Sequence, residues 1–471
     1  MPRDQEGLHT VHDRARRRGP RPRSWLTAAV FTALALGLLP SGLPADLTVS
    51  AVADAPRAPV GPAAVLPASP PVVAGARLTG VQAAQPDGPA SAFVLTLDLS
   101  EDLRVDYLGA SRVAGTAPLE ELVARHDPGA DRVTVAAVNA DFFDINRTGA
   151  PLGAGVREGE LLHSASPGRG EAVGFDLDGA GRMLEVLFEG KAVTARGELP
   201  LDGYNAARLP VDGIGLYGPE WGPVNRSPVV ERSQHVVEVE FRDGLVTAVN
   251  EGAGVGPIPD GGGLLVGRDA GAGALQTLTV GEPLVPVFSA RASDGGPLPH
   301  TVVGGQEPLV VDGIALNWDG APNNVTAPRT AVGFSADGTE MYLVTVDGRQ
   351  EHTVGMTLTA LASFMAELGA RNALNLDGGG STTLLARAPG ATSVRVVNMP
   401  SGGAQRPVPN GLAITAPRGA GPPPGIRVET VLVGEDGTPV EREPGDASVN
   451  ADGVPGPVDG EPALLPAANA R

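Results

Sequence analysis

The chain has 471 residues, of which 42% are hydrophobic and 4% aromatic, and it carries a formal net charge of −19 at pH 7. This acidic balance argues against nucleic acid or an anionic membrane as the main partner, because both are bound through clustered cations. The sequence has no cysteine, which excludes disulfides, thiolate metal sites and a cysteine nucleophile. Its stability must therefore come from a packed core.

Residues 1–53 have the order of a secretory signal peptide. A basic region from Arg14 to Arg23 precedes an apolar stretch from Leu26 to Leu39, and small residues follow at 51–53. The apolar stretch is shorter than the roughly 20 residues that cross a bilayer as a helix. We expect export with cleavage after Ala53, which leaves no membrane span in a secreted or cell-envelope protein. An uncleaved anchor is the alternative.

Composition divides the remaining chain into three parts. Residues 54–75 are rich in Ala and Pro and predict an extended linker. Residues 76–416 alternate apolar runs with Gly, Asp and Pro turns, and predict a single large domain with a β-rich elaboration at 176–296. Residues 417–471 are rich in Gly, Pro and acidic side chains, and predict a mostly disordered tail.

The fold class expected for 76–416 is α+β, with strand-rich mixed sheets and few helices. No repeat of fixed period is present, which argues against solenoids and propellers. Two segments have helical patterns, Pro118 to Arg125 and Thr357 to Leu368, the second with Thr357 as its N-cap. The clearest strands are Phe93 to Leu99, Val133 to Val138, Val236 to Phe241, Leu245 to Val249 and Met341 to Val346.

Within the elaboration, residues 202–222 gather aromatic, amide and guanidinium groups. Asn205, Arg208 and Trp221 are candidates for sugar binding, because sugars are bound by ring faces and by planar polar groups. The alternative for these residues is packing in the core.

The most informative stretch is 373–383, a short apolar run that leads into Asp377, three glycines and three hydroxyl residues. Successive glycines let backbone N–H groups turn inward together and bind an anion. The upstream order is a strand, Asp347, a helix and a second strand. We expect Asp347 and Asp377 at matching ends of parallel neighbouring strands, facing one cleft.

These segments resemble the phosphodiester glycosidases, the family related to the enzyme that uncovers mannose 6-phosphate by removing N-acetylglucosamine. Similar motifs extend from about Asn139 to Ala416, and a departure stands at Gln306 and Glu307. The matching motifs are 139–143 with 151–153, 304–305 with 308–309 and 312–313, 329–333, 345–349, 355–358 and 375–381.

The resemblance implies a secreted hydrolase that cleaves the glycosidic bond of a sugar-1-phosphodiester in a glycan or cell-surface polymer. Asp377 and Asp347 are the candidate carboxylates of the reaction, and Arg329 is the candidate cation for the departing phosphate. Which carboxylate serves as nucleophile or base stays open. The candidates for substrate binding are Asn139, Asp141, Gly378, Gly379, Gly380, Ser381, Thr382, Asn205 and Arg208.

Two other functions are compatible with the same residues. Asp141, Asp347 and Asp377 could hold calcium or magnesium, which prefer oxygen ligands, in a phosphodiesterase that cleaves the P–O bond. No cofactor is required by the glycosidase hypothesis. The Gly loop could instead belong to a non-catalytic module that binds anionic cell-wall glycans. The histidines show no paired spacing for zinc.

Overall fold

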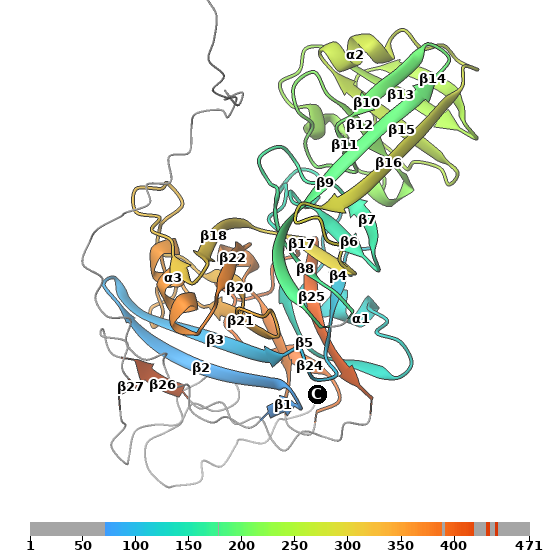
Figure 1. The fold of residues 1–471 in the computed structure, drawn as a ribbon. Helices are drawn as coiled ribbons and strands as arrows, with labels where there is room; N and C mark the ends of the chain where they lie inside the picture. The colour runs from blue at the N-terminus through green and yellow to red at the C-terminus, as the bar shows by residue number, and fades with distance from the viewer. Residues whose placement is uncertain (1–70, 178, 389–390, 419–429, 434–438, 441–471) are drawn as a thin grey trace, which may run out of the picture. The chain divides into compact units, whose positions relative to one another are not determined.

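The computed structural model describes residues 71–177, 179–388, 391–418, 430–433 and 439–440 (Figure 1). The expected signal peptide, most of the linker and most of the tail lie outside these residues. Strand β1 begins at Pro71, inside the expected linker, and β25 ends at Pro417, so the described strands begin slightly before the predicted domain. Two short strands, at 430–433 and 439–440, lie within the tail.

The described part is rich in strands and poor in helices, in agreement with the predicted fold class (Figure 1). Most strand pairs are antiparallel, but β2 pairs with β26 and β11 with β12 in parallel, so the sheets are mixed. The helical segments are α1 (Leu119–Arg125), α2 (Ala270–Leu275), α3 (Leu358–Glu367), and the 3-10 turns η1 (Pro219–Trp221), η2 (Ser227–Val230) and η3 (Gly379–Ser381).

The largest sheet has ten strands and carries the Gly loop. Its order is β19-β18-β22-β20-β21-β3-β2-β26-β27, and β1 pairs with β2. The strands are β1 (Pro71–Val73), β2 (Ala76–Gln85), β3 (Gly88–Asp98), β18 (Gln306–Val311), β19 (Ile314–Ala315), β20 (Arg329–Phe334), β21 (Glu340–Val346), β22 (Asn372–Leu376), β26 (Thr430–Val433) and β27 (Pro439–Val440).

A second sheet of five strands shares the main hydrophobic core with the first. Its order is β24-β23-β5-β25-β4. Leu97, Leu374 and Leu376 of the large sheet and Val138 and Leu412 of this one lie in the same buried cluster. The strands are β4 (Arg104–Gly109), β5 (Arg132–Asn139), β23 (Leu384–Arg387), β24 (Val394–Val396) and β25 (Asn410–Pro417).

Helix α3 belongs to a second buried cluster, which includes residues of β18, β20, β21 and β22. It lies beside β18 and β22 in Figure 1. The Thr357 hydroxyl accepts a hydrogen bond from the N–H of Ala360 at 3.1 Å, as predicted for an N-cap. Apolar residues at helical spacing, among them Leu358, Leu361 and Met365, form its buried face.

The remaining strands form a seven-stranded and a five-stranded sheet. Long strands β9 and β16 pair with each other and begin and end the elaboration near the predicted limits of 176 and 296. The strands are β6 (Gly155–Arg157), β7 (Glu160–His163), β8 (Glu171–Phe175), β9 (Gly181–Thr194), β10 (Gly197–Leu201), β16 (Leu284–Ala292) and β17 (Thr301–Gly304), and in the smaller sheet β11 (Gly203–Tyr204), β12 (Ile214–Tyr217), β13 (Val236–Arg242), β14 (Leu245–Glu251) and β15 (Gly262–Arg268).

Candidate functional site

The predicted charged residues lie at the same end of three neighbouring strands in the ten-stranded sheet. Strands β21 and β22 run in the same direction and end immediately before Asp347 and Asp377. They are not neighbours, however, because β20 lies between them and is antiparallel to both. The prediction of adjacent parallel strands is therefore wrong. Because β20 is antiparallel to both neighbours, its first residue, Arg329, lies beside the ends of β21 and β22.

Asp377 combines burial with polar contacts to the loop that follows it. Its N–H donates to the carbonyl of Ala140 at 2.8 Å, which joins the end of β22 to the end of β5. Burial raises the pKa of the Asp377 carboxyl to about 6, while hydrogen bonds from Ser381 and from the Gly378 N–H, together with the charge of Arg406, act in the opposite direction. The residue keeps partial exposure, so a ligand at this loop can reach it.

The glycines of the loop leave room for two arginine side chains to approach it closely. The Gly379 N–H donates to the carbonyl of Pro328 at 2.8 Å, so this donor is occupied within the protein. Gly379 has φ of 62°, a conformation that favours glycine. A Cβ on Gly380 would collide with the Arg406 guanidinium, and one on Gly379 would lie 3.4 Å from the nearer Arg349 nitrogen. Two arginines therefore lie against the glycines for which the sequence predicted a cradle of backbone amides.

Arg349 and Arg406 are the cations that the sequence reasoning did not select. Arg349 is exposed, has φ of 60°, and its guanidinium forms no hydrogen bond or ion pair with any described residue. The Arg406 guanidinium donates from Nη1 to the Ser381 hydroxyl at 3.3 Å. Arg349 belongs to the 345–349 motif, but nothing in the sequence around Arg406 distinguishes it. Both guanidinium groups lie against the loop that carries Asp377.

Asp141 is a second carboxyl group beside Asp377. It is 2% exposed, and its Oδ2 accepts a hydrogen bond from the N–H of Gly153 at 3.0 Å. A Cβ on Gly304 would lie 2.6 Å from the same oxygen, so these glycines leave room for the carboxyl. Burial, and secondarily the negative charge of Asp377, raise the pKa of Asp141 well above its ordinary value. Burial and the neighbouring charge therefore favour the neutral form of the Asp141 carboxyl.

Asn139 and Arg329 lie at the site and use their polar groups on the protein itself. The Asn139 amide donates to the carbonyl of Asp377 at 2.6 Å, and its oxygen accepts from Thr330 and from the N–H of Thr383. The Arg329 Nε donates to the carbonyl of Met356 at 2.9 Å, and its Nη2 donates to carbonyls in the 323–325 loop. These contacts fix the backbone around Asp377. They leave the Arg329 Nη1 as the nitrogen for which the structure gives no hydrogen bond.

Asp347 is likewise occupied within the protein. It is 2% exposed, and it accepts hydrogen bonds from the Asn398 amide at 2.9 Å and from the N–H of Met399 at 3.0 Å. Burial raises its pKa to about 6, and these hydrogen bonds oppose the rise. The carboxyl fastens the end of β21 to the segment after β24. Its contacts are those of a positioning residue.

Part of the chain is similar to known proteins. Residues 235–415 match the family model described as phosphodiester glycosidase. The bovine N-acetylglucosamine-1-phosphodiester alpha-N-acetylglucosaminidase is 44% identical over 62 residues, which is 13% of this chain and 11% of that enzyme. The SPbeta prophage-derived protein YomE of Bacillus subtilis (strain 168) is 37% identical over 94 residues, 20% of this chain and 14% of YomE. Residues 235–415 belong to the phosphodiester glycosidase family.

A solved structure extends the likeness in fold. The crystal structure of a hypothetical protein from Synechocystis superposes with a TM-score of 0.57 and 24% identity, and the match covers 72% of this chain and 61% of that one. The chain thus spans only a small part of the relatives named above and less than two thirds of this neighbour. The phosphodiester glycosidase region includes Arg329, Asp347, Asp377 and Arg406, whereas Asn139 and Asp141 precede it.

Glu307 stands where this phosphodiester glycosidase region departs from the expected motif. Its φ of 52° explains why a glycine would be common at such a position. Its carboxylate accepts hydrogen bonds from the amides of Asn323, at 2.5 Å, and Asn375, at 2.8 Å. Burial raises its pKa, and the nearby charges of Arg169 and Arg329 oppose the rise. The departure therefore places a further carboxyl group near Arg169 and Arg329.

The elaboration contributes less than predicted. Trp221 is fully buried, with its ring edge-on to Tyr217 at 5.0 Å between centroids, so its faces are not available to a sugar. Asn205 is fully buried as well, and its amide bonds to the carbonyl of Leu162 and the N–H of Gly218. Arg208 is different, because its side chain is 53% exposed and lies 3.6 Å from the Asp144 carboxylate.

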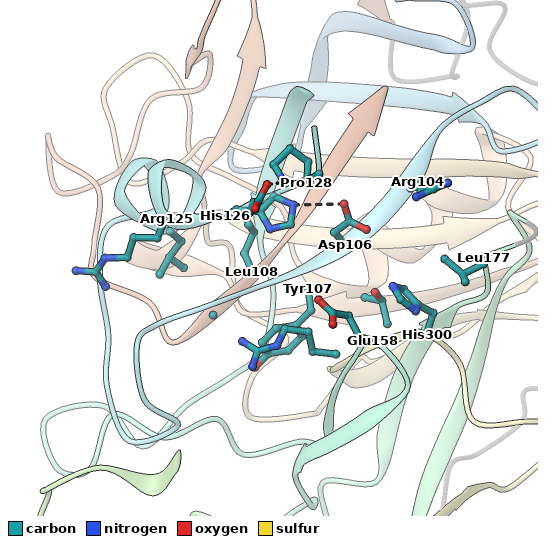
Figure 2. Close-up of a pocket in the computed structure, with 16 residues that line it drawn as sticks. Arg104, Asp106, Tyr107, Leu108, Arg125, His126, Pro128, Glu158, Leu177 and His300 are labelled. Carbon is teal, nitrogen blue, oxygen red and sulfur yellow. Dashed lines mark hydrogen bonds and ion pairs between the residues drawn. The ribbon is translucent and has the colours of Figure 1, made fainter. Parts of the chain in front are cut away.

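In the described part of the chain, no metal cluster is found at the Gly loop, and the cavity shown in Figure 2 lies elsewhere. Within the described ranges, no group of three or more His, Cys, Asp or Glu side chains could hold a metal ion, and no helix is long and apolar enough to cross a membrane. A cavity of about 550 Å³ is lined instead by residues of β4, the end of α1 and the turn before β17 (Figure 2). There His126 lies 3.3 Å from Asp106, and Tyr107 forms part of the wall.

Proposed function

We propose that the protein hydrolyses the glycosidic C–O bond of a sugar-1-phosphodiester, as the name of its bovine relative describes for that enzyme. The observation that supports this most is the position of Arg349 and Arg406 against Gly379 and Gly380, next to the Asp377 carboxylate. A phosphodiester on this loop would be held by planar cations, while its sugar would meet a carboxylate. The substrate class is a phosphodiester-linked glycan.

The chemistry follows from the charges of these groups. When the bond between C1 and the phosphate oxygen breaks, its electron pair leaves with the phosphate, and a fixed cation stabilises the added charge. We assign this role to Arg406 and Arg349. Ionised Asp377 stabilises the positive charge that develops at C1, in the manner of glycosidase carboxylates. Water supplies the new oxygen at C1, and the products are the free sugar and a phosphomonoester.

Asp141 would complement Asp377 in this reaction. Because burial and the neighbouring charge favour its protonated form, it can donate a hydrogen bond to the sugar without adding a second negative charge. Asn139, Ser381, Thr382 and Asp347 hold the backbone and side chains around Asp377 in place. In this proposal they act as positioning residues.

Hydrolysis in oxygen-labelled water tests the proposal. The substrate is the benzyl phosphodiester of N-acetylglucosamine α-1-phosphate, and the label should appear in the sugar. Label in the phosphate would support the alternative of a phosphodiesterase that cleaves P–O. Pre-treatment with EDTA separates the two further, because an enzyme that needs calcium or magnesium on Asp141 and Asp377 would lose turnover and regain it with the ion. Retained glycan binding without any turnover would favour the non-catalytic module.

We also propose that the protein is exported. Support comes from the basic, apolar and small-residue order of residues 14–53. Mass analysis of the secreted protein should find an N-terminus near Asp54. An intact N-terminus on membrane-bound protein would show an uncleaved anchor instead.

A further inference from the structure

A second pair of arginines lies on the Asp141 side of the site. Arg169 stands in the turn between β7 and β8, with its guanidinium carbon 5.9 Å from the centre of the Phe142 ring. Arg208 follows β11, and its Nη2 is 3.6 Å from the Asp144 carboxylate. Both arginines therefore contact the segment that also carries Asp141.

The turn that holds Arg169 is fastened beside Asp141 by backbone hydrogen bonds. The N–H of Ser166 donates to the carbonyl of Leu152 at 2.8 Å, and that residue precedes Gly153, whose N–H binds the Asp141 carboxyl. The N–H of Arg169 in turn donates to the carbonyl of Ser166 at 3.0 Å. The position of Arg169 next to the site is thus a property of the fold.

The polar atoms of this turn are not satisfied by the described protein. The Arg169 Nη1 and the Ser166 hydroxyl are buried and have no hydrogen-bond partner among the described residues. A buried donor without a partner costs on the order of 1–3 kcal/mol. Such atoms at the edge of a candidate site are best explained by a ligand that completes their hydrogen bonds.

The two arginine side chains indicate that this ligand is an anion. Burial, and secondarily the charge of Arg208, lower the pKa of the Arg169 guanidinium, while the charges of Glu307 and Asp141 act in the opposite direction. The Glu307 carboxylate also accepts hydrogen bonds from the amides of Asn323 and Asn375. An anion between two guanidinium groups would relieve their repulsion.

This anion cannot be the scissile phosphate if Arg349 and Arg406 hold that group. Arg349 and Arg406 lie against Gly379 and Gly380, whereas Arg169 and Arg208 contact Phe142 and Asp144, so the two arginine pairs lie on different segments of the site. We propose that Arg169 and Arg208 bind a second anion, and that the preferred substrate is a phosphodiester of a sugar that itself carries a phosphate or a carboxylate. This inference rests on the proposed function for the first phosphate only.

The test compares three benzyl phosphodiesters, those of N-acetylglucosamine α-1-phosphate, of its 6-phosphate and of its 6-carboxylate. The wild-type protein should have a higher kcat/KM for at least one charged sugar than for the neutral one. The charged substrate with the higher kcat/KM then identifies the anion as phosphate or carboxylate. In Arg208→Gln this preference should fall about tenfold, the size of one charge-assisted hydrogen bond. The matched control is Arg291→Gln, another exposed arginine paired with a carboxylate, which should keep the preference.

Two outcomes contradict the inference while leaving the proposed function intact. One is equal kcat/KM for all three substrates, and the other is a preference that Arg208→Gln does not reduce. If no substrate is turned over, the proposed function fails, and calorimetry then decides the inference separately. N-Acetylglucosamine 6-phosphate or its carboxylate counterpart should bind the wild-type protein more tightly than Arg208→Gln, with N-acetylglucosamine as the neutral control. Absence of this difference overturns the second anion site.

Discussion

The ends of strands β21 and β22 look alike in sequence and differ in structure. Each buried strand is followed by an Asp-Gly pair, and burial raises the pKa of both carboxyl groups to about 6. Asp347 accepts hydrogen bonds from Asn398 and Met399 and is closed off from solvent. Asp377 instead stays partly exposed between Asp141 and Arg406. Two carboxyl groups with similar pKa shifts can therefore have different roles, because the contacts and exposure of each one decide whether a ligand can approach it.

The largest expected effect separates these two residues directly. Asp377→Asn should lower turnover of the sugar-1-phosphodiester by roughly 10²-fold or more, because the change is isosteric but removes the charge. Asp347→Asn should instead lower the free energy of unfolding by on the order of 1–3 kcal/mol, since an amide would set a donor against the N–H of Met399. Kinetics and thermal unfolding on the same samples measure both. Normal turnover in folded Asp377→Asn would remove Asp377 from the reaction.

The next effect tests why the β22 loop needs glycine. A Cβ on Gly380 would enter the space of the Arg406 guanidinium, so Gly380→Ala should displace that cation and lower kcat/KM about tenfold or more. The displaced atoms are the end of a flexible side chain, and the fold should survive. The matched control is Gly402→Ala, where the nearest atom to a new Cβ is 4.0 Å away. Equal kcat/KM in the two variants would contradict a role for Arg406.

A third effect concerns Arg329, which begins the strand between the two ends. Arg329→Lys cannot reproduce the hydrogen bonds from Nε and Nη2 to the carbonyls of Met356 and the 323–325 loop. We expect a loss of unfolding free energy on the order of 1–3 kcal/mol, with a smaller change in turnover per folded molecule. A large loss of kcat without a change in thermal midpoint would instead assign Arg329 to the phosphate, through Nη1.

Much of this site could be predicted from local sequence. The helix at 358–367 and the strands before Asp347 and Asp377 follow from apolar spacing and from Gly and Thr at the helix ends. The strand order could not be predicted, because β20 enters between β21 and β22 from earlier in the chain. Local patterns do not encode which strand fills a gap between two others.

The arginines show a second limit. Arg406 and Arg169 stand in loops without periodicity, and only the close approach of distant segments gives them a role. Trp221 is the opposite case. It is an unusual residue in an aromatic-poor chain, but it packs in the core, which was the alternative to sugar binding. For Asn139, the residue type was informative, but the fold uses its amide to join two sheets. The sequence shows which side chains can form polar contacts. Which group each of them contacts depends on the tertiary structure.

The smallest expected effect is a shift in pH dependence at the end of β22. If ionised Asp377 is required, kcat/KM should fall as pH drops through about 6, since protonation removes its charge. The positive charge of Arg406 lowers the pKa of Asp377, so removing that charge must raise it. In Arg406→Gln the acid limb of the kcat/KM profile should therefore move to higher pH, on top of any loss in its plateau. Arg291→Gln, on β16, should leave the limb in place, and a limb that stays fixed in Arg406→Gln as well would mean that another group controls it.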